Sequence, residues 1–171
     1  MQKVIGFSAF SGTGKTTLIE KLVHRFKQEG LRVAVVKHDA HDFEMDKPGK
    51  DSWRFQQAGA DITILSSKTK TAMIEQRPRS LRDNLSMVHD VDLVLVEGYK
   101  SEPLPRIGLC RKASGKGLPG QPGDYLALAT DDESLTGAGV PCFPLYDVEG
   151  LAAFIKDHAL PLYDVLKDGE K

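Results

Sequence analysis

The chain has 171 residues, of which 40% are hydrophobic and 27% are charged, and its formal net charge is −1. This length predicts a single domain over residues 1–171, because one hydrophobic core can grow to roughly 250 residues before chains divide. The ordinary apolar content excludes a chain that is disordered as a whole. The near-zero charge argues against a protein that coats DNA or RNA, since such a protein needs a dominant positive field.

The cysteines and the hydrophobic pattern indicate a cytoplasmic protein. Cys110 and Cys142 form no C-x-x-C pair, and two cysteines make neither a disulfide framework nor a structural zinc site, so we expect two reduced thiols. No segment approaches the roughly 18 consecutive apolar residues of a membrane span. The N-terminus enters a strand without the charged and apolar regions of a signal peptide. We expect no membrane and no nucleic-acid partner.

The first elements follow from hydrophobic periodicity. Residues 4–7 are an apolar run that predicts a buried strand, and a Ser/Gly-rich loop follows it. From Thr16 the apolar residues recur at helical spacing, and Gly30 supplies a stop. Residues 33–36 are apolar at every position, which favours a strand in a sheet that helices cover on both faces.

The later elements continue this alternation. We expect loops at 38–50 and 111–124, helices at 51–58, 81–88 and 148–158, and strands at 62–65, 71–75, 93–96, 106–110 and 125–129. Asp147 is a suitable N-cap for the last helix. Strands interleaved with helices predict an α/β, three-layer, P-loop NTPase-like domain with a mostly parallel central sheet.

The most informative motif lies between the first strand and the first helix. Gly14, Lys15 and Thr16 match the end of the P-loop template G-x-x-x-x-G-K-[ST], whereas Ala9 replaces its first glycine. Glycines here let backbone N–H groups turn inward around phosphate oxygens, and the helix start adds partial positive charge. The candidate phosphate-binding residues are Gly12, Thr13, Gly14, Lys15, Thr16 and Thr17. Lys15 suits the β- and γ-phosphates, and the Thr16 hydroxyl suits Mg²⁺.

A second acidic residue is expected at the end of another central strand, where it would hold the metal's water shell. Glu97 ends the clearest later strand, and Gly98 lets the chain turn away next to phosphate. Asp92 lies at the opposite end of that strand, roughly 15 Å away, and is interpreted as structural. The sequence therefore predicts Thr16 and Glu97 as the metal-binding residues.

The polar loop after the second strand has three interpretations that the residues leave open. His38 and His41 could chelate a transition metal. The loop's carboxylates, among them Asp42 and Asp46, could instead contact Mg²⁺ or an attacking water, as in a switch segment. The third interpretation is a solvated acidic loop.

The base of the nucleotide is not determined by these residues. The tetrad N-K-x-D, whose aspartate reads guanine in many P-loop proteins, does not occur in this chain. Asp131 follows a predicted strand and could accept the guanine N–H groups, or it could be an ordinary acidic turn residue. ATP and GTP both remain open at this level.

Six segments together resemble a known family. They are residues 11–18 (S-G-T-G-K-T-T-L), 36–39 (V-K-H-D), 46–52 (D-K-P-G-K-D-S), 58–60 (A-G-A), 95–100 (L-V-E-G-Y-K) and 147–151 (D-V-E-G-L). The chain is similar to the molybdopterin-guanine dinucleotide biosynthesis protein B (MobB) family over nearly its whole length. The phosphate loop is common to many families, but the D-K-P-G-K-D-S segment and the V-E-G-Y-K segment are much more specific. Alanine at the place of Ala9 is usual in that family.

The resemblance implies a GTP-binding protein with weak, Mg²⁺-dependent GTPase activity. Such a protein assists the attachment of GMP to molybdopterin, and the attachment itself belongs to a MobA-type guanylyltransferase partner. The resemblance also implies a homodimer with an extended sheet. It assigns the phosphate site to residues 12–17 and the Walker-B-type acid to Glu97, while the catalytic residue stays unknown.

Two other functions remain as alternatives. One is a small-molecule P-loop kinase, in which Arg77, Arg79 and Arg82 would clamp phosphate as a lid, although a basic solvated face explains them as well. The other is a non-catalytic, nucleotide-gated adaptor that delivers molybdopterin or docks the guanylyltransferase. Hydrolysis is expected to be slow in any case, because the sequence offers no clear water-positioning residue or arginine finger.

Overall fold

The computed structural model describes residues 1–39 and 43–167 of the chain. Its contacts divide the chain into two compact units, Met1–His38 with Leu81–Lys171, and Asp39–Ser80. The sequence-based expectation of one domain stays a prediction. None of the helices in the described ranges is long and apolar enough to cross a membrane.

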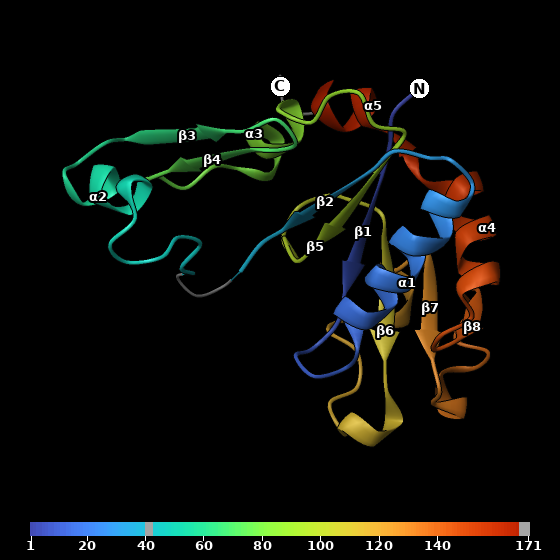
Figure 1. The fold of residues 1–171 in the computed structure, drawn as a ribbon. Coiled ribbons are helices and arrows are strands. Elements are labelled where there is room, and N and C mark those ends of the chain that lie inside the picture. Colours follow the sequence, from blue (N-terminus) through green and yellow to red (C-terminus); the bar gives the residue numbers. More distant parts are fainter. Residues whose placement is uncertain (40–42, 168–171) are drawn as a thin grey trace. The chain divides into compact units, whose positions relative to one another are not determined.

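The first unit contains the central sheet and the helices that cover it (Figure 1). Its elements are β1 (Lys3–Ser8), α1 (Lys15–Gln28), β2 (Val33–Lys37), α3 (Leu81–Ser86), β5 (Leu93–Glu97), β6 (Arg106–Cys110), β7 (Ala127–Thr130), β8 (Cys142–Pro144), α4 (Val148–His158), β9 (Leu160–Pro161) and α5 (Leu162–Lys167). Short 3-10 turns lie at Lys112–Ser114, Pro122–Asp124 and Glu133–Leu135.

Within the described residues the sheet has seven strands in the order β2-β5-β1-β6-β7-β8, and β9 pairs with the start of β1. Every pairing along that path is parallel, whereas β9 runs antiparallel to β1. Because the strands are parallel, their carboxyl ends meet at one edge of the sheet, where ligands of open α/β folds bind. The predicted three-layer α/β fold with a mostly parallel sheet is confirmed.

Two hydrophobic cores cover the two faces of the sheet. Helices α1 and α4 pack on one face against a buried cluster that includes Ile5, Phe7 and Leu95. Helices α3 and α5 pack on the other face against a cluster that includes Val4 and Val96. Side chains that alternate along β1 and β5 therefore enter opposite cores, as the period of a strand requires.

Strand β2 departs from the expectation of burial on both faces. It lies at the edge of the sheet, and the Val35 side chain is 47% exposed. Its all-apolar sequence gave no sign of the edge position, because a run of valines suits an edge as well as an interior strand.

The second unit contains α2 (Asp51–Gln57) and the antiparallel hairpin of β3 (Ile62–Ser66) and β4 (Thr71–Glu75). The strands predicted at 62–65 and 71–75 are confirmed, but they form a separate two-stranded sheet rather than part of the central one. Ile64 pairs with Met73 across the hairpin, and Ile62 lies on the same face of β3 as Ile64. All three are substantially exposed.

Candidate functional site

The phosphate loop connects the end of β1 to the start of α1, as predicted. Gly12 and Gly14 have φ values of 81° and 95°, a left-handed conformation that favours glycine. Between them the Thr13 side chain is fully buried, and its hydroxyl donates a hydrogen bond to the Phe10 carbonyl at 2.8 Å. The first helical hydrogen bond runs from the Leu18 N–H to the Gly14 carbonyl. The backbone N–H groups at the start of α1 thus remain available to an anion.

Gly14 has a second reason to be glycine. A Cβ atom added at Gly14 would collide with the hydroxyl of Tyr146. Tyr146 packs against the α1–α4 core, and Lys21 lies over its ring at 4.6 Å from the centroid. The end of the phosphate loop is therefore braced by a residue from just before α4, which the sequence pattern did not reveal.

Glu97 occupies the end of β5 beside the phosphate loop. In the sheet it is paired with Phe7 of β1 and with Lys37 of β2. Because paired residues of neighbouring strands point to the same face, Glu97 faces the α1 side together with Phe7. The Lys15 ammonium lies 3.4 Å from its Oε1 atom, and both side chains are largely buried. The structure thus brings together the two residues that the sequence predicted to share a site.

The turn after Glu97 holds two residues in the left-handed region. Gly98 has φ of 90° and Tyr99 has φ of 50°. At Gly98 a Cβ atom would lie 3.0 Å from the His38 carbonyl. The Tyr99 hydroxyl accepts a hydrogen bond from Asn84 at 2.8 Å, and its ring packs on His38 with centroids 4.7 Å apart. These contacts hold a non-glycine residue in a conformation that costs energy in isolation.

The predicted magnesium ligands are hard oxygen donors on two neighbouring elements. Thr16 and Thr17 lie in the first turn of α1, and both are exposed. Glu97 presents a carboxylate at the end of the adjacent strand. A hydroxyl and a carboxylate fit Mg²⁺, which takes oxygen ligands and retains several waters. The donor set is therefore compatible with the metal.

Asp131 follows β7 at the same edge of the sheet. Its Oδ1 atom accepts a hydrogen bond from the Lys112 N–H at 2.6 Å, which joins the segments after β6 and β7. This bond uses one carboxylate oxygen, whereas a guanine pair uses both. The role of Asp131 in reading a base stays a prediction.

The polar loop after β2 gives no metal site within the described residues. No group of three or more His, Cys, Asp or Glu side chains in 1–39 and 43–167 could hold a metal ion. His41 and Asp42 lie outside those ranges. Asp46 accepts hydrogen bonds from the Lys47 N–H at 2.8 Å and from the Gln56 side chain at 2.9 Å. Asp46 thus stabilises its own unit.

The arginines of the kinase alternative have structural partners. The Glu75 carboxylate accepts from both Arg77 and Arg79, and these hydrogen bonds and charges keep its pKa below its usual range. Arg82 is also engaged in an interaction. Two of the three arginines therefore share one carboxylate as a partner, which does not favour a phosphate-clamping lid.

Sequence reasoning also missed a residue that reaches the phosphate loop from the segment 111–124. Lys116, in the Gly/Pro-rich segment 111–124, donates to the Ser11 carbonyl at 2.8 Å. Gly115 and Gly117 flank it with φ values of 64° and 66°. The G-K-G triplet was the available signal, because a lysine between two glycines can project from a tight turn.

The family model described as Molybdopterin guanine dinucleotide synthesis protein B matches residues 4–131. The chain belongs to the MobB family. As a member of this family, it has a role as an adapter protein in molybdopterin-guanine dinucleotide biosynthesis.

Individual relatives agree with this membership. The chain is 42% identical to a molybdopterin-guanine dinucleotide biosynthesis adapter protein of Haemophilus influenzae over 132 residues, 75% of this chain and 74% of that protein. It is 35% identical to the Escherichia coli (strain K12) adapter protein over 161 residues, 91% and 92% of the two chains. A crystal structure of Bacillus subtilis MobB superposes with a TM-score of 0.73 at 25% identity, covering 92% of this chain and 98% of that one.

Proposed function

We propose that the chain binds Mg-GTP at its phosphate loop, hydrolyses it slowly, and thereby assists the attachment of GMP to molybdopterin. The observation that carries the proposal is the Lys15–Glu97 pair, which sits where β1, α1 and β5 converge. The adapter role of the MobB family supplies the biosynthetic context. The nucleotide, the metal and the hydrolysis are our inference.

In the proposed complex the loop N–H groups and Lys15 bind the phosphates. The amino end of α1 offers free N–H groups and partial positive charge to an anion. Lys15 exchanges its contact with Glu97 for the β- and γ-phosphates. Phosphate oxygens carry negative charge comparable to that of the carboxylate and lie in a better position for the Lys15 ammonium. The exchange releases the Glu97 carboxylate for the metal's water shell.

Thr16 and Glu97 would hold Mg²⁺. When bound, the ion would neutralise charge that develops on the phosphate oxygens. The chain's own residues provide little beyond binding. The sequence offers no clear water-positioning residue or arginine finger, which supports slow hydrolysis.

The preference for guanine follows from the family inference, with Asp131 as the proposed base reader. Binding guanine through Asp131 would compete with the Lys112 N–H, so nucleotide binding and the conformation of segment 111–124 would be linked. The proposed partners are molybdopterin and a MobA-type guanylyltransferase. The proposed working unit is a homodimer, and its proposed location is the cytoplasm.

Calorimetry with Mg-GTP and Mg-ATP tests the nucleotide site. Wild type is expected to bind Mg-GTP more tightly than Mg-ATP, and Lys15→Ala is expected to lose at least tenfold in affinity. Lys27→Ala is the matched control, because Lys27 is an exposed lysine later on the same helix. Equal affinity of wild type and Lys15→Ala for Mg-GTP would sink the site assignment, and tighter binding of Mg-ATP would overturn the guanine assignment.

The adaptor and kinase alternatives are separated by the fate of the γ-phosphate. The proposal expects free phosphate at a slow rate. Phosphate that appears on a small-molecule acceptor would indicate a kinase. A variant that binds GTP without hydrolysing it, yet still supports cofactor formation, would identify a purely gated adaptor.

A further inference from the structure

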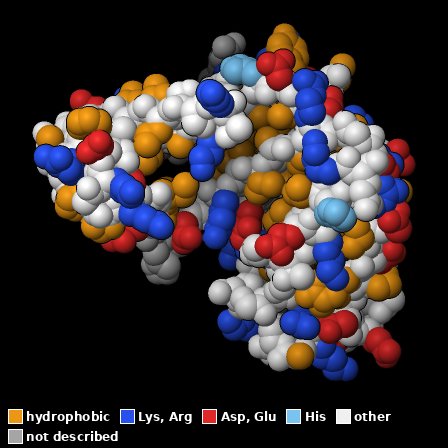
Figure 2. All heavy atoms as spheres, viewed as in Figure 1, with side chains coloured by type: hydrophobic (Ala, Val, Ile, Leu, Met, Phe, Trp, Pro, Cys, Tyr) orange, Lys and Arg blue, Asp and Glu red, His pale blue; other side chains and the backbone are white. Residues whose placement is uncertain are grey.

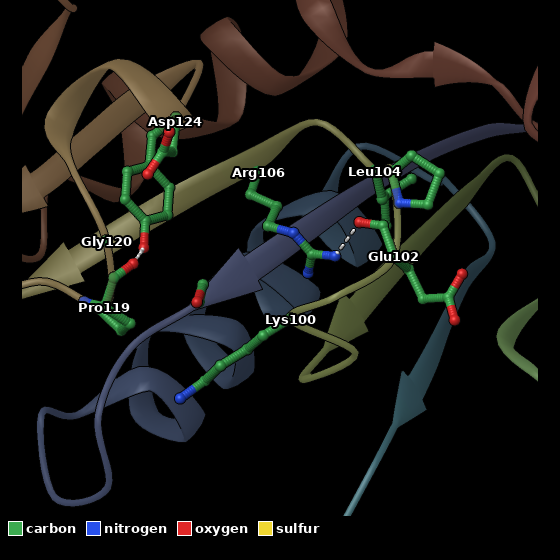
Figure 3. Close-up of a pocket in the computed structure, with 10 residues that line it drawn as sticks. Lys100, Glu102, Leu104, Arg106, Pro119, Gly120 and Asp124 are labelled. Carbon is green, nitrogen blue, oxygen red and sulfur yellow. Dashed lines mark hydrogen bonds between the residues drawn. The ribbon is translucent and has the colours of Figure 1, made fainter.

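A cavity lies on the face of the sheet away from α1. Its volume is about 570 Å³, and Ser8 forms part of its lining. Figure 3 shows the side chains that line it. Ile5 and Phe7 of β1 enter the α1 core, whereas Val4 enters the opposite core. Alternation along the strand therefore places Gly6 and Ser8 on the face opposite α1. The cavity is thus distinct from the phosphate loop, although Ser8 immediately precedes that loop.

Two glycines on neighbouring strands make room for its walls. A Cβ atom at Gly6 would lie 3.0 Å from Arg106 Cγ and 3.2 Å from Leu104 Cδ2. A Cβ atom at Gly108 would lie 2.9 Å from the Tyr125 ring. Because neither glycine has a side chain, Arg106 and Tyr125 can lie across the strands. Both Arg106 and Tyr125 line the cavity.

Arg106 places a buried positive charge at this wall. Its side chain donates to the carbonyls of Gly98 at 2.8 Å and Glu102 at 2.6 Å, and also to that of Tyr99. Arg106 is only 6% exposed, and burial lowers the pKa of its guanidinium. No carboxylate in the described parts of the chain forms an ion pair with it. Carbonyl dipoles and, at longer range, the Glu102 carboxylate compensate the guanidinium in part.

Lys100 adds a second cation at the cavity's edge. Its ammonium lies 5.2 Å from the centroid of the Phe10 ring in the phosphate loop. Glu102 and Asp124 also line the cavity. In Figure 3 the Glu102 carboxylate points away from Lys100 and Arg106, and Asp124 Oδ2 accepts from the Gln121 N–H at 2.8 Å and keeps its negative charge. Within residues 1–39 and 43–167 neither Lys100 nor Arg106 forms an ion pair, so neither charge is cancelled by direct contact with a carboxylate.

We propose that this cavity binds a small phosphate monoester, at a site separate from the proposed GTP site. A tetrahedral dianion can accept hydrogen bonds from Lys100 and Ser8 while it faces the Arg106 charge. Pro103, Leu104 and Pro119 also line the cavity and provide apolar surface for the organic part of the ligand. The volume lies within the range of about 300–1,000 Å³ that small-molecule sites occupy.

Ribose 5-phosphate is a suitable probe, followed through the backbone amide signals of the ¹⁵N-labelled full chain. Saturable shifts are expected at Gly6, Gly108, residues 99–102 and Leu104. The Lys100→Gln variant should bind about tenfold more weakly, since it loses a charge-assisted hydrogen bond. Lys27→Gln should bind as wild type does, because Lys27 is an exposed lysine of α1 on the other face. Both variants change exposed side chains and should fold normally.

Further titrations show which part of the ligand is bound and at which site. Ribose without phosphate should cause no shifts, and inorganic phosphate should bind at least tenfold more weakly than ribose 5-phosphate. Shifts should persist in Lys15→Ala, because Lys15 lies in the phosphate loop. Loss of the shifts in Lys15→Ala, equal binding by Lys100→Gln, equal binding of inorganic phosphate, or no shifts in wild type would each overturn the proposal. None of these results depends on whether Mg-GTP binds, so this site and the proposed GTP site can fail separately.

Discussion

The Lys15 ammonium lies 3.4 Å from the Glu97 carboxylate, and the two side chains are 16% and 10% exposed. Partial burial makes each charge costly without the other, because neither is fully hydrated. A nucleotide can therefore separate the pair only by giving Lys15 a phosphate and Glu97 a hydrated cation. In the proposed complex the pair would link phosphate binding to metal binding.

Glu97→Gln should uncouple phosphate binding from metal binding. We expect the affinity for GTP in the presence of Mg²⁺ to fall at least tenfold, because the carboxylate no longer holds the metal's water shell. In EDTA the variant should bind GTP at least as well as wild type, since Lys15 no longer has to leave an anion. Calorimetry at matched ionic strength measures both.

Asp92→Asn is the control for that experiment, because Asp92 stands at the other end of the same strand and bonds to Arg32. It should leave the Mg²⁺ dependence of GTP binding unchanged. If Glu97→Gln keeps the Mg²⁺ dependence of wild type, Glu97 does not serve the metal.

Gly14→Ala should abolish nucleotide binding. Alanine at φ of 95° costs about 1–2 kcal/mol in backbone energy, and its Cβ would also collide with the Tyr146 hydroxyl. Gly12→Ala has a similar φ but open space around its Cβ, so it should destabilise the protein less. Thermal melts and GTP titrations compare them. Tyr146→Phe combined with Gly14→Ala should recover part of the lost stability, and no recovery would mean that the collision is not the cause.

Asp92 should make the free energy of unfolding depend on pH in the acid range. Hydrogen bonds from the Arg32 N–H and from its side chain lower the pKa of Asp92 below the ordinary 3.8. The folded state then binds fewer protons than the unfolded state near that pH, so this contribution is complete above about pH 4 and is lost as the pH falls through the lowered pKa. Urea melts from pH 6 to pH 2.5 should show a shallower loss for Asp92→Asn. Identical slopes for both proteins would contradict this assignment.

Ile64→Asp should convert the proposed homodimer to a monomer. Ile64 is 64% exposed, and Ile62 and Met73, on the same face of the hairpin, are 46% and 43% exposed. Figure 2 shows hydrophobic side chains spread over the surface of this unit, and such patches mark interaction surfaces. Light scattering after gel filtration measures the mass. Leu65→Asp is the matched control on the other face of the hairpin and should stay dimeric; a dimer that survives Ile64→Asp would exclude this face.

Asp131→Asn should reduce the preference for GTP over ATP at least tenfold, since an amide cannot accept both guanine N–H groups. Its thermal stability should fall slightly through the weakened bond to the Lys112 N–H. Competition binding of the two nucleotides measures the preference. An unchanged preference with lowered stability would make Asp131 a loop residue only.

Local signals predicted most of the elements. Helix α4 spans Val148–His158 as expected, and Asp147 caps it by accepting from the Gly150 N–H. The phosphate loop and Glu97 were also predictable, because each lies at a strand end marked by a change of hydrophobic period. Strands β8 and β9 and helix α5 were missed. They are short, and β9 exists only because it pairs with the distant strand β1.

The remaining features depend on contacts between distant segments. Lys116 could not be placed on Ser11, nor Tyr146 against Gly14, because no local pattern encodes which loops meet. The left-handed conformation of Tyr99 was likewise hidden, since tyrosine rarely adopts it without support from its surroundings. Sequence reasoning therefore located the loop and the strand-end carboxylate but not the residues that brace them.

Strand β1 separates two sets of neighbours by the parity of its residues: Ile5 and Phe7 face α1, whereas Gly6 and Ser8 face the opposite side of the sheet, where a Cβ atom at Gly6 would meet Arg106. A single inserted or deleted residue within this strand would exchange the two sets, placing bulky side chains where Arg106 now lies and leaving a glycine in the α1 core. Insertions should therefore be absent from residues 3–8 throughout the family. Segment 111–124 carries no such constraint, and changes of length among relatives should accumulate there.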